Sequence, residues 1–236
     1  MTERTVRWGG VAAIVFVVLI LVTAFSAGEP PAADDAVDKM RDYFVDHRSA
    51  LLASNLIGLV AVPFALWFAV VLRELLRGDP TTNALGVASL AGLVLTASMA
   101  LAGGAVATSV VYVDGVADKL DGDTLRIVYE AQSLLFAATS AGIVLFSLTA
   151  GLAIRRTAAL PAYTMWLALL ATLGNVLTMF STAGAGASML GFTGLLTFAL
   201  FVLVTGITMA LGKTSPSGVD GEHPRMIREE APTAGP

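Results

Sequence analysis

The sequence contains no cysteine, few charged residues and only two histidines, and each scarcity excludes a class of site. Without cysteine, the chain forms no disulfide, thiolate metal site, iron–sulfur cluster or cysteine nucleophile. His47 and His223 both lie outside the long apolar runs, so a haem held by two intramembrane histidines is excluded as well. We therefore expect no metal and no cofactor. No basic patch suits nucleic acid.

Short motifs that mark familiar catalytic sites are also missing. The sequence has no HExxH, no GxSxG, no Walker sequence and no GxGxxG after a strand. The glycine-rich stretch AGAGAS joins two apolar runs, so we interpret it as a turn and not as a phosphate-binding loop. These absences favour a protein that is not an enzyme.

Charged residues make up 14% of the chain and hydrophobic residues 56%, whereas about a quarter of a soluble protein is charged. Mean hydropathy is +0.78. The charges gather between apolar runs long enough to cross a bilayer as helices. This pattern predicts an all-α membrane protein, a six-transmembrane-helix bundle in contact with the lipid bilayer. The predicted spans are about residues 9–27, 49–72, 84–112, 127–154, 162–182 and 189–211.

Residues 28–48, between the first two spans, are acidic and amphipathic. Val37, Met40 and Phe44 recur there at helical spacing, with charged residues between them. The pattern predicts a short extracytoplasmic helix that turns these three side chains inward and begins at Asp34 or Asp35. Such a helix is either a solvated lid or a surface for a partner.

Basic residues predict the orientation, because they are retained on the cytoplasmic side of a membrane. Nine of the fourteen basic residues fall at one set of span ends: Arg4, Arg7, Arg73, Arg77, Arg155, Arg156, Lys213, Arg225 and Arg228. The other ends hold eleven of the eighteen acidic residues. We expect a six-span domain over residues 1–212 in the plasma membrane, both termini cytoplasmic, and a disordered cytoplasmic tail over 213–236. A cleaved signal peptide is the alternative for the first run.

Four amide or carboxylate side chains lie inside the predicted spans, all within about 11 Å of their outer ends at helical rise. They are Asn55, Glu130, Gln132 and Asn175. Polar groups inside a membrane normally face the bundle interior or a water-filled cavity. The four therefore predict a shallow, outward-facing polar pocket. In the alternative interpretation, Arg126 pairs with Glu130 one helical turn away at the membrane surface.

One face of the fourth span is almost entirely small or polar. Its members, at alternating spacings of three and four, are Glu130, Ser133, Ala137, Ser140, Val144 and Ser147. Small residues let membrane helices approach closely, so we interpret this stripe as a packing surface, with the wall of a pathway as the alternative. Gly103 and Gly104 on the third span receive the same packing interpretation.

The order of features resembles a known family. The acidic segment ends in YFVDHRSALLAS and leads into an apolar run that closes with WFAVVLR, and a short RRTAALP turn follows the fourth span. Over about residues 9–211, the chain resembles uncharacterised six-span integral membrane proteins of actinobacteria. That family has no assigned activity, so the resemblance implies a fold and no catalytic residue.

Two functions are compatible with these observations. The first is a non-enzymatic membrane protein that acts through a membrane-protein partner or binds a small molecule or lipid. The second is a transporter or channel subunit that uses the outward-facing pocket. The near absence of charge inside the spans favours the first, because coupled transporters usually carry carboxylates or broken helices near the midplane.

Overall fold

The computed structural model describes residues 1–26, 28, 30–32, 35–180 and 188–214, and this part contains eight helices and no strand. Six helices are long and apolar enough to cross a membrane, which confirms the predicted number of spans. They are α1 (Glu3–Ser26), α3 (Arg48–Leu75), α4 (Pro80–Val111), α6 (Gly122–Thr157), α7 (Ala162–Phe180) and α8 (Ser188–Ala210). Their ends lie within about four residues of the predicted ones, except that α1 begins at Glu3 instead of residue 9 and α6 at Gly122 instead of residue 127. Residues 181 and 182, predicted to end the fifth span, lie outside the described part.

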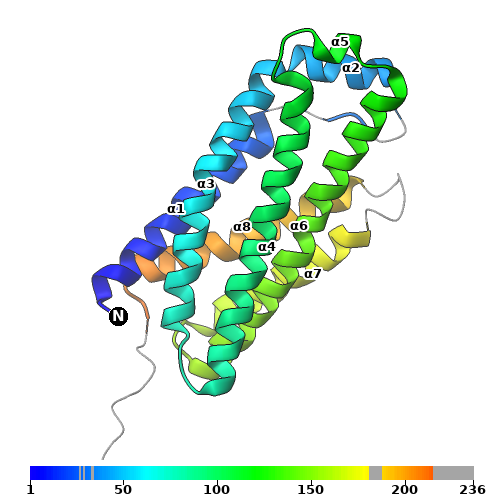
Figure 1. Ribbon diagram of the computed structural model, residues 1–236. Helices are drawn as coiled ribbons and strands as arrows, with labels where there is room; N and C mark the ends of the chain where they lie inside the picture. Colours follow the sequence, from blue (N-terminus) through cyan, green and yellow to red (C-terminus); the bar gives the residue numbers. More distant parts are fainter. Residues whose placement is uncertain (27, 29, 33–34, 181–187, 215–236) are drawn as a thin grey trace, which may run out of the picture.

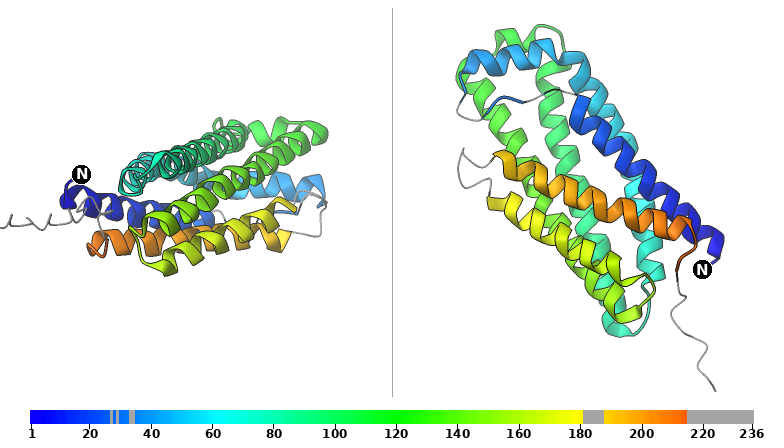
Figure 2. Two further views of the ribbon diagram at one scale, coloured as in Figure 1. Left: turned by 90° about the horizontal axis from the view of Figure 1, so that it is seen from below. Right: turned by 180° about the vertical axis from the view of Figure 1, so that it is seen from behind.

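The six long helices form a ring in which each helix packs mainly against two neighbours (Figures 1 and 2). The neighbours follow chain order, α1 with α3, α4 with α6 and so on, and α8 closes the ring against α1. Tight turns join α3 to α4 and α6 to α7, and a helix that ends in a tight turn must return beside its predecessor. The bundle is therefore built from antiparallel neighbours.

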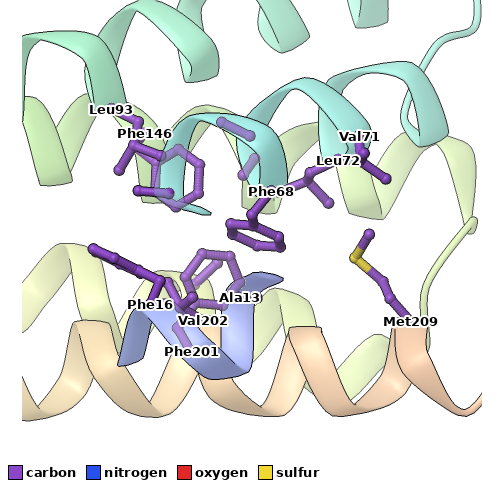
Figure 3. Close-up of a cluster of buried hydrophobic side chains, with 14 of the residues drawn as sticks. Ala13, Phe16, Phe68, Val71, Leu72, Leu93, Phe146, Phe201, Val202 and Met209 are labelled. Carbon is purple, nitrogen blue, oxygen red and sulfur yellow. The ribbon is translucent and has the colours of Figure 1, made fainter. Parts of the chain in front are cut away.

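Phenylalanine side chains fill the middle of the ring (Figure 3). The ring centroid of Phe146 lies 6.3 Å from that of Phe68, 6.1 Å from that of Phe198 and 5.9 Å from that of Phe201. Phe16 adds an edge-to-face contact with Phe198 at 6.2 Å. We call these five residues the aromatic cluster. The surrounding core draws buried side chains from all six long helices, so the ring has no open centre at this level.

Helices α4 and α6 approach each other most closely where two glycines face one another. A Cβ at Gly92 would lie 2.5 Å from the Phe146 backbone nitrogen, and a Cβ at Gly142 would lie 2.6 Å from the Gly92 carbonyl oxygen. At these distances only glycine fits. Ser89 and Thr96 of α4 extend the contact by donating to the carbonyl oxygens of Phe146 and Thr139.

Two short helices, α2 (Val37–Asp46) and α5 (Val116–Lys119), cover one end of the ring (Figure 1). Met40 and Phe44 are fully buried there, and Val37 is half-buried against the same core, which confirms the predicted inward face of the amphipathic helix. They join a second apolar core with seven further members: Tyr43, Leu51, Val110, Val111, Ala117, Leu125 and Tyr129. We call α2, α5 and this core the cap.

The start of α2 differs from the prediction. Its N-cap is Ala36, and no side chain caps it. Asp35 instead accepts hydrogen bonds from the Ala32 backbone nitrogen and the Lys39 ammonium, both at 2.7 Å. The bond from Lys39 is the main reason that the pKa of Asp35 lies below its usual value. Asp34 lies outside the described residues.

Aspartates cap the two longest helices at their N-termini. Asp79 accepts from the backbone nitrogen of Thr82 at 2.9 Å, and Asp121 accepts from that of Thr124 at 2.9 Å. These bonds favour the ionised carboxylates, so the pKa of each aspartate lies below its usual value. The capping residues fix where α4 and α6 begin.

Candidate functional site

A zone between the aromatic cluster and the cap lacks buried residues on four of the long helices. It comprises residues 18–26 of α1, 52–60 of α3, 94–102 of α4 and 130–139 of α6, and none of these residues is buried. Each stretch exceeds two helical turns, so even the face turned toward the other helices keeps some exposure. The part of α3 beside the aromatic cluster does contain buried residues, namely Ala61, Ala65 and Phe68. We call the four stretches the cap-side zone.

Asn55 lies in this zone against a glycine of the neighbouring helix. A Cβ at Gly104 of α4 would lie 2.6 Å from the Asn55 side-chain oxygen, so the absence of a side chain there makes room for the amide. Asn55 is half-buried, and its side chain has no hydrogen-bond partner among the residues that the structure describes. The sequence suggested a pocket role for Asn55 and a packing role for Gly104. The structure joins the two in one contact.

Gln132 of α6 is the second amide of the zone. Its side-chain oxygen is buried and accepts no hydrogen bond within the described part of the chain. A buried polar atom without a partner costs about 1–3 kcal/mol, so native proteins seldom keep one without a reason. Water or a ligand carrying a donor group would satisfy this oxygen. Arg73 Nε and Thr205 Oγ1 are the other buried side-chain atoms without a partner in the described part, and both lie outside the cap-side zone. Gln132 is therefore the residue of this zone with an unsatisfied buried group.

Glu130 is exposed, and the structure gives it no ion pair and no hydrogen bond with a described side chain. The alternative interpretation, a pair with Arg126, is not formed. Arg126 instead donates to the backbone carbonyl of Asp35 at 2.9 Å and so ties α6 to the start of α2. Glu130 remains at the edge of the cap-side zone with its carboxylate available.

Asn175 of α7 is buried and fully engaged. Its side-chain nitrogen donates to the Ala171 carbonyl oxygen at 2.9 Å and to the Gly194 carbonyl oxygen of α8 at 3.0 Å. A single short turn joins α6 to α7, so positions along both helices can be counted from it. By helical rise, Asn175 lies about 20 Å from this turn and Glu130 about 40 Å. The two do not share the depth that the sequence suggested, and the contacts of Asn175 are those of a packing residue.

The small-residue stripe of α6 divides into two parts. Ser140 and Ser147 are buried, and Ser147 shares a hydrogen bond of 2.9 Å with Thr172 of α7. Ser133 is exposed and Ala137 only half-buried, because both lie in the cap-side zone. Gly103 of α4 is buried, with Leu135 and Phe136 of α6 at van der Waals distance from its position.

The glycine contact between α4 and α6 was not predicted from the sequence. Gly92 follows Ala91, and Gly142 follows Ser140 and Ala141, so both glycines lie among other small residues, and neither belongs to the stripe of α6. No group of three or more histidine, aspartate or glutamate side chains among the described residues is arranged to hold a metal ion.

Comparison with family models, with curated proteins and with solved structures finds no match to this chain. The resemblance to actinobacterial six-span proteins therefore stays a prediction.

Proposed function

We propose that this chain is a non-enzymatic, multi-pass membrane protein that binds a small molecule or lipid in the cap-side zone. The observation that carries the proposal is a pair of amides, Asn55 and Gln132, that have no hydrogen-bond partner among the described residues. They lie in the only part of the four helices where long stretches lack a buried residue. Ligand sites combine a mostly apolar wall with a few polar groups that fix orientation. The exposed carboxylate of Glu130 would add an anionic group at the edge.

The shape of the bundle supports binding over conduction. The aromatic cluster fills the ring below the cap-side zone, and the cap covers the ring above it. A channel or transporter needs a polar path through the same centre. Asn175, the amide nearest the middle of the bundle, donates its hydrogen bonds to backbone carbonyls of α7 and α8. A ligand that enters between helices from the side or from the cap is stopped by the aromatic cluster.

Paired cysteine variants test whether the zone is reachable from water. The chain has no native cysteine, so one introduced thiol reports alone. We expect Asn55→Cys to react with a membrane-impermeant thiol reagent in intact cells. Leu56→Cys is the matched control, because Leu56 is the next residue and is 62% exposed on the outer surface of the bundle. A thiol in hydrocarbon does not ionise and reacts poorly. Equal labelling of both variants, or of neither, would contradict a site that water reaches.

Recovery of the ligand tests the binding itself. Wild-type protein purified in mild detergent is extracted with organic solvent, and small molecules are identified by mass spectrometry. The double variant Asn55→Ala/Gln132→Ala should lose the bound species. Asn83→Ala, which removes an amide at the far end of α4, should keep it. An extract that is the same for all three proteins would overturn the proposed function.

A further inference from the structure

A shallow cavity of about 300 Å³ opens on the outer surface of the bundle between α6 and α7, far from the cap. Its lining comes from six residues: Gly151, Leu152 and Arg155 of α6, with Met165, Trp166 and Leu169 of α7. This volume is at the lower end of the range for ligand sites. The cavity lies near the turn that joins the two helices, at the end of the bundle where the chain's basic residues gather.

Close helix packing produces the hollow. Gly151 is buried, and a Cβ there would lie 3.0 Å from the Ala168 Cβ, so the two backbones approach where both side chains are minimal. Larger side chains on either side project beyond this contact and form the walls of the cavity. Leu152 is 39% exposed and Trp166 is 65% exposed, so the hollow faces the surroundings of the bundle and not its core. In a membrane, those surroundings are lipid.

Arg155 supplies a cation at the rim of this apolar hollow. Three other arginines at the same end pair with carboxylates: Arg7 with Glu3 at 2.8 Å, Arg73 with Glu74 at 2.8 Å and Arg77 with Glu74 at 3.4 Å. Arg155 is exposed and has no ion pair or hydrogen bond with any residue that the structure describes. A guanidinium presents a planar fork of donors that matches a phosphate group.

We propose that the α6–α7 cavity binds an anionic phospholipid. One acyl chain lies in the hollow over Gly151, and the phosphate meets the guanidinium of Arg155. Arg155 is near the last turn of α6 and Trp166 is in the second turn of α7, which is the depth of lipid headgroups and of interfacial tryptophan. Basic pockets between helices at the cytoplasmic face are typical sites for anionic headgroups. This site is separate from the cap-side zone, so its test does not depend on the proposed function.

The fluorescence of Trp166 measures lipid binding, because this side chain lines the cavity. Trp8 and Trp67 are both about half exposed on the outer surface, and we replace each with phenylalanine so that Trp166 is the only indole. The protein is reconstituted in vesicles of phosphatidylcholine with either brominated phosphatidylglycerol or brominated phosphatidylcholine. Bromine quenches indole fluorescence only at short range. We expect the relative binding constant at Trp166 to favour the anionic lipid about fivefold, the effect of one basic residue near the membrane surface.

Three variants separate a built site from general surface charge. Arg155→Gln should lower the preference to about one, and Arg155→Lys should restore part of it. Arg156→Gln removes the same charge one residue away, outside the cavity lining, and should keep the full preference. Circular dichroism confirms that each variant is folded. Equal quenching by the two lipids in the parent protein would overturn the proposal. An equal loss in the Arg155 and Arg156 variants would overturn it too.

Discussion

Single glycines determine how closely the helices of this bundle approach. In a membrane, no hydrophobic effect drives helices together, so packing and short-range contacts carry the association. Gly92 and Gly142 remove the side chains that would hold α4 and α6 apart, and Gly10 and Gly206 do the same for α1 and α8. A Cβ at Gly10 would lie 2.4 Å from the Gly206 carbonyl oxygen. Two of the six helix contacts of the ring are thus backbone against backbone.

We predict that Gly92→Ala destabilises the fold by about 1–3 kcal/mol, the usual cost of overpacking. The added methyl would meet backbone atoms of α6, which cannot rotate away. Gly58→Ala is the control, because a Cβ at this α3 glycine has nothing within 4 Å. Alanine there should be neutral or stabilise the helix by up to about 1 kcal/mol. Unfolding of both variants in mixed micelles of mild detergent and sodium dodecyl sulfate measures the difference. Equal stability of the two would contradict the close contact.

The polar residues of the candidate site were predictable as a set, but their partners were not. Any amide inside an apolar run is costly, so Asn55, Gln132 and Asn175 stand out in the sequence. The sequence does not show that Asn175 faces the Gly194 carbonyl oxygen while Asn55 faces a glycine without a side chain. That distinction depends on the rotation of two helices about their axes. Apolar residues surround these positions on every side, so periodicity does not fix the rotation.

The cap is an element held by arginines that bind backbone carbonyls. Arg48 donates to the Val111 carbonyl oxygen at 2.8 Å, and Arg41 donates to the carbonyl oxygens of Ala117 and Leu120. These bonds fasten α2 and the start of α3 to the segment around α5. The last carbonyls of a helix lack partners within it, which makes them natural acceptors for a guanidinium. Carboxylates of the cap such as Asp38 and Asp42 are left exposed.

We predict that Arg41→Gln loosens the cap. A hydrogen bond from a charged donor contributes about 1.5–3 kcal/mol, so backbone amide exchange across α2 should become at least about tenfold faster. Lys39→Gln is the matched control, because it removes a cation of the same helix whose partner, Asp35, is one turn away on the surface. Such a pair contributes little, and exchange should change about twofold. Hydrogen–deuterium exchange with peptide mass spectrometry measures the exchange rate of α2 in both variants. Similar rates in the two variants would show that Arg41 does not fasten the cap.

Hydropathy predicted the long helices well, because a run of about 20 apolar residues has few other uses in a protein. It predicted α2 from its alternation of charged and apolar residues, since one face of that helix meets water. It missed α5, whose four residues are too few to show a period. The cap contacts were not predicted either. An arginine that binds a backbone carbonyl has no acidic partner that could be recognised in the sequence.

The whole molecule combines a closed ring, a filled centre and a covered end. Chain order predicts which helices are neighbours, but the contact between α1 and α8 joins the two ends of the sequence and depends on the closing of the ring. The aromatic cluster is also a property of the whole, because Phe16, Phe68, Phe146 and Phe198 come from four different helices. In the sequence these side chains resemble phenylalanines that face lipid, such as the 64% exposed Phe180.

Access to the cap-side zone depends on the orientation of the molecule in the membrane. Positive residues are retained in the cytoplasm, and the end opposite the cap holds Arg73, Arg77, Arg155 and Arg156. We expect the cap to face outward. Asp118→Cys, on the exposed surface of α5, should react with an impermeant thiol reagent in intact cells. Thr81→Cys, exposed in the first turn of α4 at the other end, should react only after the membrane is permeabilised. The reverse pattern would place the cap-side zone toward the cytoplasm, and any ligand would then have to come from inside the cell.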